Sequence, residues 1–166
     1  MKKKILGVMA AALILGMGAG TSYAYLTGRD QADNYFAASE TKIEIQETFT
    51  PVSKLTPGMV ITKAPRAVSS SDVSCYVRMT VRFSDSEAKS FCEPLVIRQG
   101  WSDRGDGYYY WEKELQPGET TDALFDSVAV KKDAGAEELK PFEILVYAEA
   151  VQSRGMGMEE AWRTLS

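Results

Sequence analysis

The sequence predicts an all-β protein, a jelly-roll-like antiparallel β-sandwich with one or two short helices, preceded by an N-terminal signal peptide. Several segments alternate apolar and polar residues with a period of two, and clusters of Pro, Gly and Asp separate these segments. No long stretch has the 3.6-residue period of an amphipathic helix. The 166 residues are 45% hydrophobic and 25% charged, which is typical of a folded domain.

The first 24 residues have the pattern of a secretory signal peptide. Three lysines at positions 2 to 4 precede an uncharged apolar run at residues 5–19, and Ser22-Tyr23-Ala24 supplies small residues at the −3 and −1 positions of a cleavage site. A helical run of about 15 residues spans roughly 22 Å, less than the roughly 30 Å membrane core. We therefore expect cleavage between Ala24 and Tyr25 and no stable membrane span afterwards; the alternative is an uncleaved anchor.

The remaining chain divides into two parts. Residues 25–40 are loosely patterned and predict a mobile N-terminal segment, whereas residues 41–166 predict one β-sandwich domain. The clearest strand is residues 73–83, in which Val77 and Met79 share one face and Arg78 lies on the other. Residues 142–151 are apolar on both faces, which predicts a central strand covered on both sides. Other expected strands are residues 41–49, 95–97, 108–115 and 124–130, and the expected short helices are residues 84–89 and 158–165.

Charge and composition exclude several functions. Removal of the first 24 residues, with their three lysines, leaves 16 Lys and Arg against 23 Asp and Glu, a net charge of −7. This balance argues against a nucleic-acid partner. The sequence contains no His, so it has no Ser-His-Asp triad, no Cys-His pair and no His-ligated zinc. We therefore expect no catalytic residues, no metal site and no cofactor.

Cys75 and Cys92 are the only two cysteines, and an exported protein permits a disulfide between them. A plain antiparallel hairpin would place Cys92 opposite Val81, roughly 20 Å along the strand from Cys75, which is too far for a bond. A crossing other than a hairpin would allow it, so the sequence leaves the disulfide open. Neither thiol has a base beside it in sequence, which argues against catalysis.

The segment between residues 101 and 111 allows two interpretations. Its aromatic residues could form a platform for stacking sugars, but strand alternation sends half of them inward and favours a core with an aromatic rim. Asp103 and Asp106 could ligate Ca²⁺, but the segment lacks the spacing of a calcium loop, so a hairpin turn is favoured. The aromatic residues are Trp101, Tyr108, Tyr109, Tyr110 and Trp111.

Several segments resemble the TasA/camelysin group of exported Gram-positive proteins, including clostridial relatives. The similarity comprises the signal region ending at Ala24, the stretch Ala32-Asp33-Asn34-Tyr35-Phe36, the turn Leu55-Thr56-Pro57-Gly58 and the strand Cys75-Tyr76-Val77-Arg78-Met79. The resemblance implies processing by a SipW-type signal peptidase and a jelly-roll subunit of extracellular fibres. It also implies that an N-terminal segment of one subunit completes a sheet of the next. Camelysin has been regarded as a protease, but this chain has no His-Glu-x-x-His motif, so proteolysis is not carried over.

On this basis we expect a secreted structural protein of the biofilm matrix or cell surface that associates with itself or with related subunits. Residues 25–40 would donate a strand, with Tyr25, Leu26, Tyr35 and Phe36 as anchors. The alternative is a monomeric secreted or wall-associated module that binds a carbohydrate or a protein. A measurement of assembly in solution distinguishes the self-associating subunit from the monomeric module.

Overall fold

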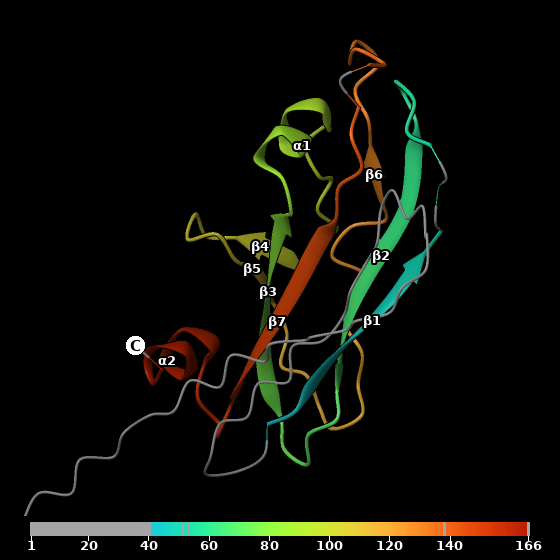
Figure 1. The fold of residues 1–166 in the computed structure, drawn as a ribbon. Helices are drawn as coiled ribbons and strands as arrows, with labels where there is room; N and C mark the ends of the chain where they lie inside the picture. The colour runs from blue at the N-terminus through green and yellow to red at the C-terminus, as the bar shows by residue number, and fades with distance from the viewer. Residues whose placement is uncertain (1–40, 51, 53, 138, 166) are drawn as a thin grey trace, which may run out of the picture.

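The computed structural model describes residues 41–50, 52, 54–137 and 139–165. Seven strands and two short helices follow one another along the chain (Figure 1). The strands are β1 Ile43–Phe49, β2 Val60–Ser69, β3 Cys75–Phe83, β4 Trp101–Asp103, β5 Tyr109–Trp111, β6 Ser127–Ala129 and β7 Ile144–Gln152. The helices are α1 Ser86–Phe91 and α2 Met158–Arg163.

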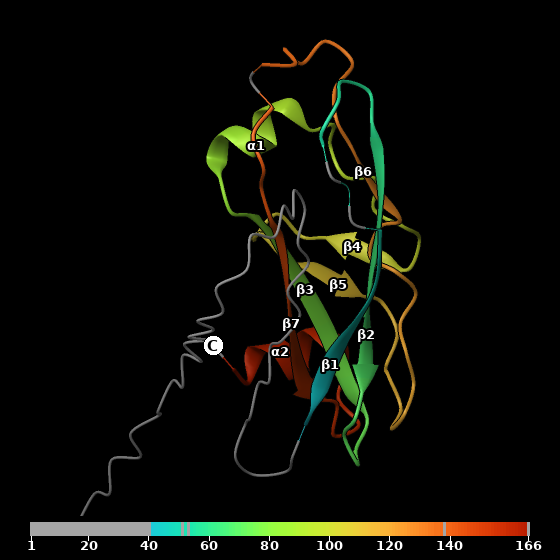
Figure 2. The same ribbon diagram turned by 45° about the vertical axis from the view of Figure 1, so that its right-hand side comes forward.

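The strands form two antiparallel sheets that face each other. The first sheet has the order β1-β2-β6, and the second has the order β4-β5-β3-β7. Figures 1 and 2 show β1 and β2 on one side of the domain, with β3 and β7 on the other. This arrangement confirms the all-β sandwich with two short helices. The described strands form sheets of three and four strands, whereas a jelly roll has eight in two Greek keys, so that finer assignment is not confirmed.

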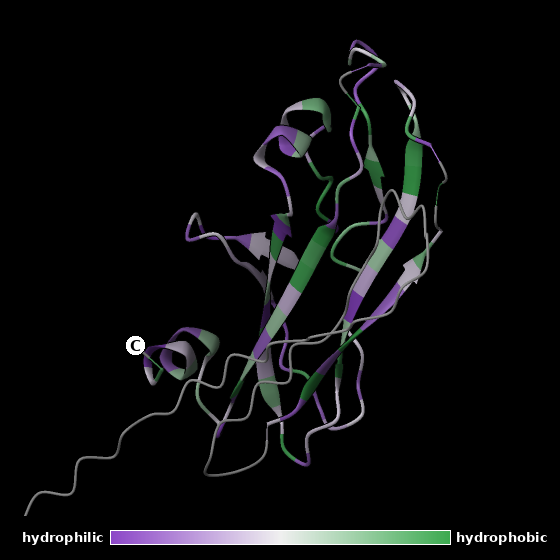
Figure 3. Cartoon of the chain, viewed as in Figure 1, coloured by the Kyte–Doolittle hydropathy of each residue, from purple (hydrophilic) through white to green (hydrophobic). Residues whose placement is uncertain are grey.

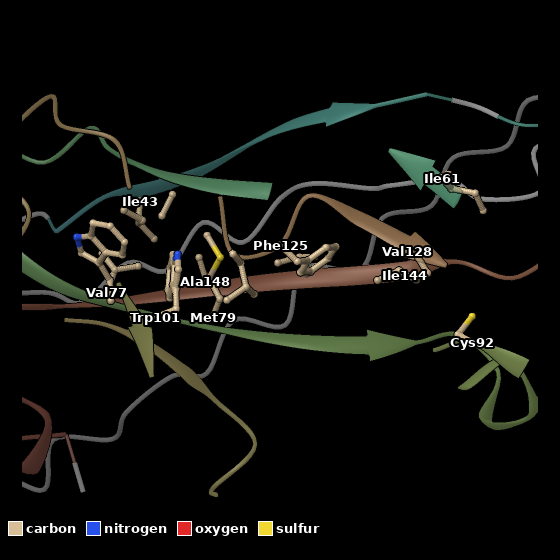
Figure 4. Packing of buried hydrophobic residues seen from close by; sticks show 14 of the residues in the cluster. Ile43, Ile61, Val77, Met79, Cys92, Trp101, Phe125, Val128, Ile144 and Ala148 are labelled. Atoms are coloured by element: carbon tan, nitrogen blue, oxygen red, sulfur yellow. The ribbon is translucent and has the colours of Figure 1, made fainter. Parts of the chain in front are cut away.

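The core lies between the sheets and comes from the alternation that the sequence shows. On β3, Cys75, Val77 and Met79 are fully buried, and on β7 the inward residues run from Ile144 to Ala150. Figure 4 shows the buried side chains in a row between the two sheets. Each buried aliphatic side chain contributes about 1.5 to 3 kcal/mol of hydrophobic stabilisation, so this row provides most of the driving force for folding.

Strand β2 is the longest strand, yet it is not among the strands expected from the sequence. Pro65 lies in its middle, and proline is rare inside a sheet because it has no N–H to donate. Here the register removes the conflict. The bonds Thr50 N–H to Thr62 C=O and Ser70 N–H to Lys42 C=O place the hydrogen-bonded pairs at even-numbered residues, so Pro65, opposite Glu47, directs its backbone away from β1. On that side its carbonyl accepts a bond of 2.9 Å from the backbone N–H of Leu124. The missing donor therefore disturbs no pair between β1 and β2.

Both short helices lie where the sequence predicts them. Asp85 caps α1, because its side chain accepts a hydrogen bond of 2.8 Å from the N–H of Glu87. Helix α1 buries Ala88 and Phe91 in the main core. Helix α2 buries Ala161 and Trp162 against the outer face of the four-stranded sheet, which gives that face a small second core.

Two expectations about strands are wrong. Residues 95–97 form no strand; Leu95 and Ile97 pack against the core from an extended loop after Pro94. Residues 142–151 do not form a central strand, since β7 is the last strand of its sheet and β3 is the inner one. The outer face of β7 is apolar at Val151 because α2 covers it there, whereas Tyr147 is 39% exposed.

Candidate functional site

The tryptophans of the aromatic segment belong to the core. Trp101 on β4 and Trp111 on β5 are opposite each other in register, both nearly buried, with ring centroids 5.3 Å apart. Gly100 has φ of +93°, and a Cβ there would come within 2.6 Å of Trp111 Cζ3, so a glycine is needed beside the ring. Trp101, Tyr110 and Trp111 are buried and Tyr108 and Tyr109 are partly buried, which agrees with the core-and-rim interpretation. The two tryptophans are therefore not available to stack a sugar.

Asp103 and Asp106 stabilise the turn between β4 and β5. Asp103 accepts from the backbone N–H of Gly105 at 2.8 Å, and Asp106 accepts from the N–H of Tyr108 at 3.0 Å and from the hydroxyl of Tyr110 at 2.6 Å. The hydrogen bond from Tyr110 is the main cause that lowers the pKa of Asp106. The carboxylates are thus used by the hairpin, as the turn interpretation expects.

Arg78 is the centre of a polar and aromatic cluster on the outer face of the four-stranded sheet. Its Nε and Nη2 donate to Glu149 Oε2 at 2.8 and 2.6 Å, and its Nη1 donates to the Tyr110 hydroxyl at 3.0 Å. The guanidinium lies 4.0 Å from the ring centroid of Tyr108 and 4.4 Å from that of Trp162 on α2. Through these hydrogen bonds and ring contacts Arg78 joins the β4-β5 hairpin and α2 to the sheet.

The two cysteines are buried free thiols. Cys75 begins β3, whereas Cys92 follows α1, beyond the other end of β3, and nine strand residues span roughly 26 Å between the first and the last. Figure 4 shows Cys92 at the end of the core opposite Val77. The disulfide that the sequence leaves open is therefore not formed. Burial raises the pKa of each thiol to about 11, so neither is a thiolate near neutral pH.

A groove of about 630 Å³ lies beside the last part of β3, between α1, the segment after it and the β4-β5 hairpin. Val81, Phe83, Leu95 and Tyr109, each partly buried, form its apolar wall. Its charged residues are Arg82, Lys89, Glu93 and Lys131. The sequence gives no signal for this groove, because its residues come from four separate segments.

The remaining predicted site residues lie outside the described residues. These are the cleavage pair Ala24 and Tyr25 and the donor-strand anchors Tyr25, Leu26, Tyr35 and Phe36, all within residues 1–40. Among the residues that the structure does describe, no helix is both long and apolar enough to cross a membrane.

The protein is thus a β-sandwich in which the tryptophan pair, the aspartates of the β4-β5 turn and the Arg78 cluster all stabilise the fold. Residues 1–71 match the model of the camelysin metallo-endopeptidase family. The match confirms the resemblance to the TasA/camelysin group, whose members are typically extracellular or attached to the cell surface. A search of curated proteins and a search of solved structures found no match.

The family description implies a metal, and the donors among the described residues do not fit one. The sequence has no His, and the described residues contain no group of three or more Cys, Asp and Glu that could hold an ion. The two thiols lie at opposite ends of the core, and Asp106 is already bonded to Tyr110. We therefore derive no metal-dependent step for this chain.

Proposed function

We propose that this protein is an exported, non-enzymatic structural subunit that associates with itself by strand addition, as a component of extracellular fibres or of a biofilm matrix. The proposal includes cleavage after Ala24 by a SipW-type signal peptidase, so that Tyr25 becomes the first residue. It is supported by the camelysin match over residues 1–71, which covers the signal region and the expected donor segment. Homologous matrix subunits are alternative partners to a second copy.

The observation that carries the proposal is that the sandwich is open rather than closed. The three-stranded sheet ends on β1, and bonds such as Ser70 N–H to Lys42 C=O show that even-numbered residues of this segment face β2. The backbone groups of Ile43 and Ile45 therefore point away from β2, and among the described residues no strand pairs with that side. An open edge is a template for a strand from another chain.

The deletion of residues 25–38 tests the proposal. The chain that begins at Tyr25 should form oligomers or fibres in sedimentation and electron microscopy, and the deleted chain should stay monomeric with the same β signal in circular dichroism. A free peptide of residues 25–40 should shorten the assemblies of the full chain. If the deleted chain assembles as well as the full one, strand donation is wrong. If the full chain stays monomeric at every concentration and pH tested, a monomeric binding module replaces the subunit.

A further inference from the structure

The last part of β3 has an open side that faces the groove described above. Ser84 N–H donates to Glu143 C=O and Ser153 N–H donates to Ser74 C=O, so even-numbered residues of β3 direct their backbone groups to β7. The odd-numbered Val81 and Phe83 therefore direct theirs to the opposite side. Strand β5 pairs with β3 only at Arg78 and Met79, so within the described part of the chain no strand covers Val81 or Phe83.

The groove combines this open edge with an apolar wall and a positive rim. Val81 and Phe83 line it together with Leu95 and Tyr109, which are only partly buried. Arg82 and Lys89 are exposed on its rim, and neither forms an ion pair with a described carboxylate. Lys131 adds a third positive charge against the single acidic residue, Glu93. The chemistry suits an extended peptide that is acidic and carries one large apolar side chain.

Residues 25–40 of this chain have that chemistry. They contain Asp30, Asp33 and Glu40 against one basic residue, Arg29, a net charge of −2, and they include the pair Tyr35 and Phe36. Successive side chains of an extended strand point to opposite faces, so one of the two rings can enter the groove while the other stays outside. The edge of β1 is open as well, but it is a poorer acceptor for an acidic segment: its exposed charged side chain is Glu44, β1 has no basic residue, and Glu47 is paired with Lys63.

We propose that the groove along Val81 and Phe83 is the acceptor for residues 30–40 of a second copy of this chain. The donated segment hydrogen-bonds to the backbone of Val81 and Phe83, one aromatic ring packs against Leu95 and Tyr109, and its carboxylates face Arg82 and Lys89. This inference rests on the proposed function, since it names the surface that receives the donor strand. Association should therefore weaken as salt is added, because the rim charges are exposed.

The test reverses the rim charges in the chain that begins at Tyr25. Arg82→Glu with Lys89→Glu should raise the concentration needed for assembly at least about 10-fold without changing the melting temperature by more than a few degrees. Lys54→Glu with Arg154→Glu changes the net charge equally at exposed sites outside the groove and should leave assembly unchanged. Asp30→Lys with Asp33→Lys, added to the rim reversal, should restore assembly.

The possible outcomes distinguish an error in the acceptor surface from an error in the proposed function. If the variant Arg82→Glu with Lys89→Glu assembles like its control, while the deletion of residues 25–38 abolishes assembly, the groove is not the acceptor. The proposed donation of the N-terminal strand then still stands. If the rim reversal blocks assembly and the swapped donor does not restore it, residues 30–40 are not its partner. If the deletion itself has no effect, the proposed function and this inference both fail.

Discussion

Lys63 and Glu47 form an ion pair on the inner face of the three-stranded sheet, between the two layers of the sandwich. Their side chains are 1% and 5% exposed, and Lys63 Nζ lies 5.5 Å from the centroid of the Phe49 ring. On β2, Lys63 alternates in step with the core residues Ile61 and Ala67, so the charge points inward. Figure 3 shows hydrophilic bands interrupting β2. Each charge is tolerated in the interior because the other neutralises it.

Removal of one partner of this pair should damage the fold much more than removal of both. Lys63→Met leaves Glu47 buried without its counter-charge, and we expect a loss of about 3 to 5 kcal/mol in the free energy of unfolding. The double variant Lys63→Met with Glu47→Leu should recover most of that loss, because an apolar pair can fill the same space. Urea unfolding measures both.

An exposed ion pair provides the control. Arg98 and Asp126 are 46% and 60% exposed at their side chains, so Arg98→Ala should cost about 1 kcal/mol or less. If Lys63→Met is no more harmful than Arg98→Ala, the pair is not buried in solution and β2 is placed wrongly.

Gly100→Ala should destabilise the domain because the new methyl group meets the Trp111 ring. The backbone at this position has φ of +93°, and the Cβ would lie 2.6 Å from Trp111 Cζ3, so we expect a loss of about 2 kcal/mol or more. Gly105→Ala is the matched control, since it has φ of +78° with no atom within 4 Å, and should cost about 1 kcal/mol. Equal melting temperatures for the two variants would contradict the packing of Trp111 beside Gly100.

The contribution of Asp106 to stability should depend on pH. The hydrogen bond from Tyr110 holds the pKa of Asp106 below its usual range in the folded state. A lowered folded pKa gives stability that is fully present above the unfolded pKa of about 3.9 and is lost as pH falls through the folded value. The difference in melting temperature between the wild type and Asp106→Ala should thus be present at pH 7 and shrink at acidic pH below about 3.9. In a Tyr110→Phe background this pH dependence should be smaller; an unchanged dependence would contradict the role of Tyr110.

The sequence predicts β3 well because its alternation is complete and its inward face is entirely apolar. It does not predict β2, because Lys63 and Pro65 interrupt the pattern and only the contacts with Glu47 and the Leu124 segment explain them. The sequence of a strand shows its alternation of apolar and polar residues, but it does not show which residues of the neighbouring strand or layer its side chains will contact. Val151 is misleading for the same reason: its outward apolar side chain meets α2 and not another sheet layer.

The candidate site depends even more on tertiary structure. The anchors of the donor segment can be proposed from sequence, since Tyr35 and Phe36 stand out in a polar stretch. The groove cannot, because β3, α1, the loop at Leu95 and the hairpin at Tyr109 come together only in the fold. A strand pattern also does not show how far a neighbouring strand extends, and the edge at Val81 is open because β5 begins only at Tyr109, opposite Met79.

The most direct test of the central claim, that the protein is a subunit joined by its N-terminal segment, is sedimentation of the chain that begins at Tyr25, with and without its aromatic anchors. A donated strand must offset about 1 to 2 kcal/mol per ordered residue, so it needs its apolar contacts as well as its backbone bonds. Tyr35→Ala with Phe36→Ala should therefore leave a folded monomer over a concentration range in which the unchanged chain forms large assemblies. Assemblies of equal size and onset from both chains would contradict the account.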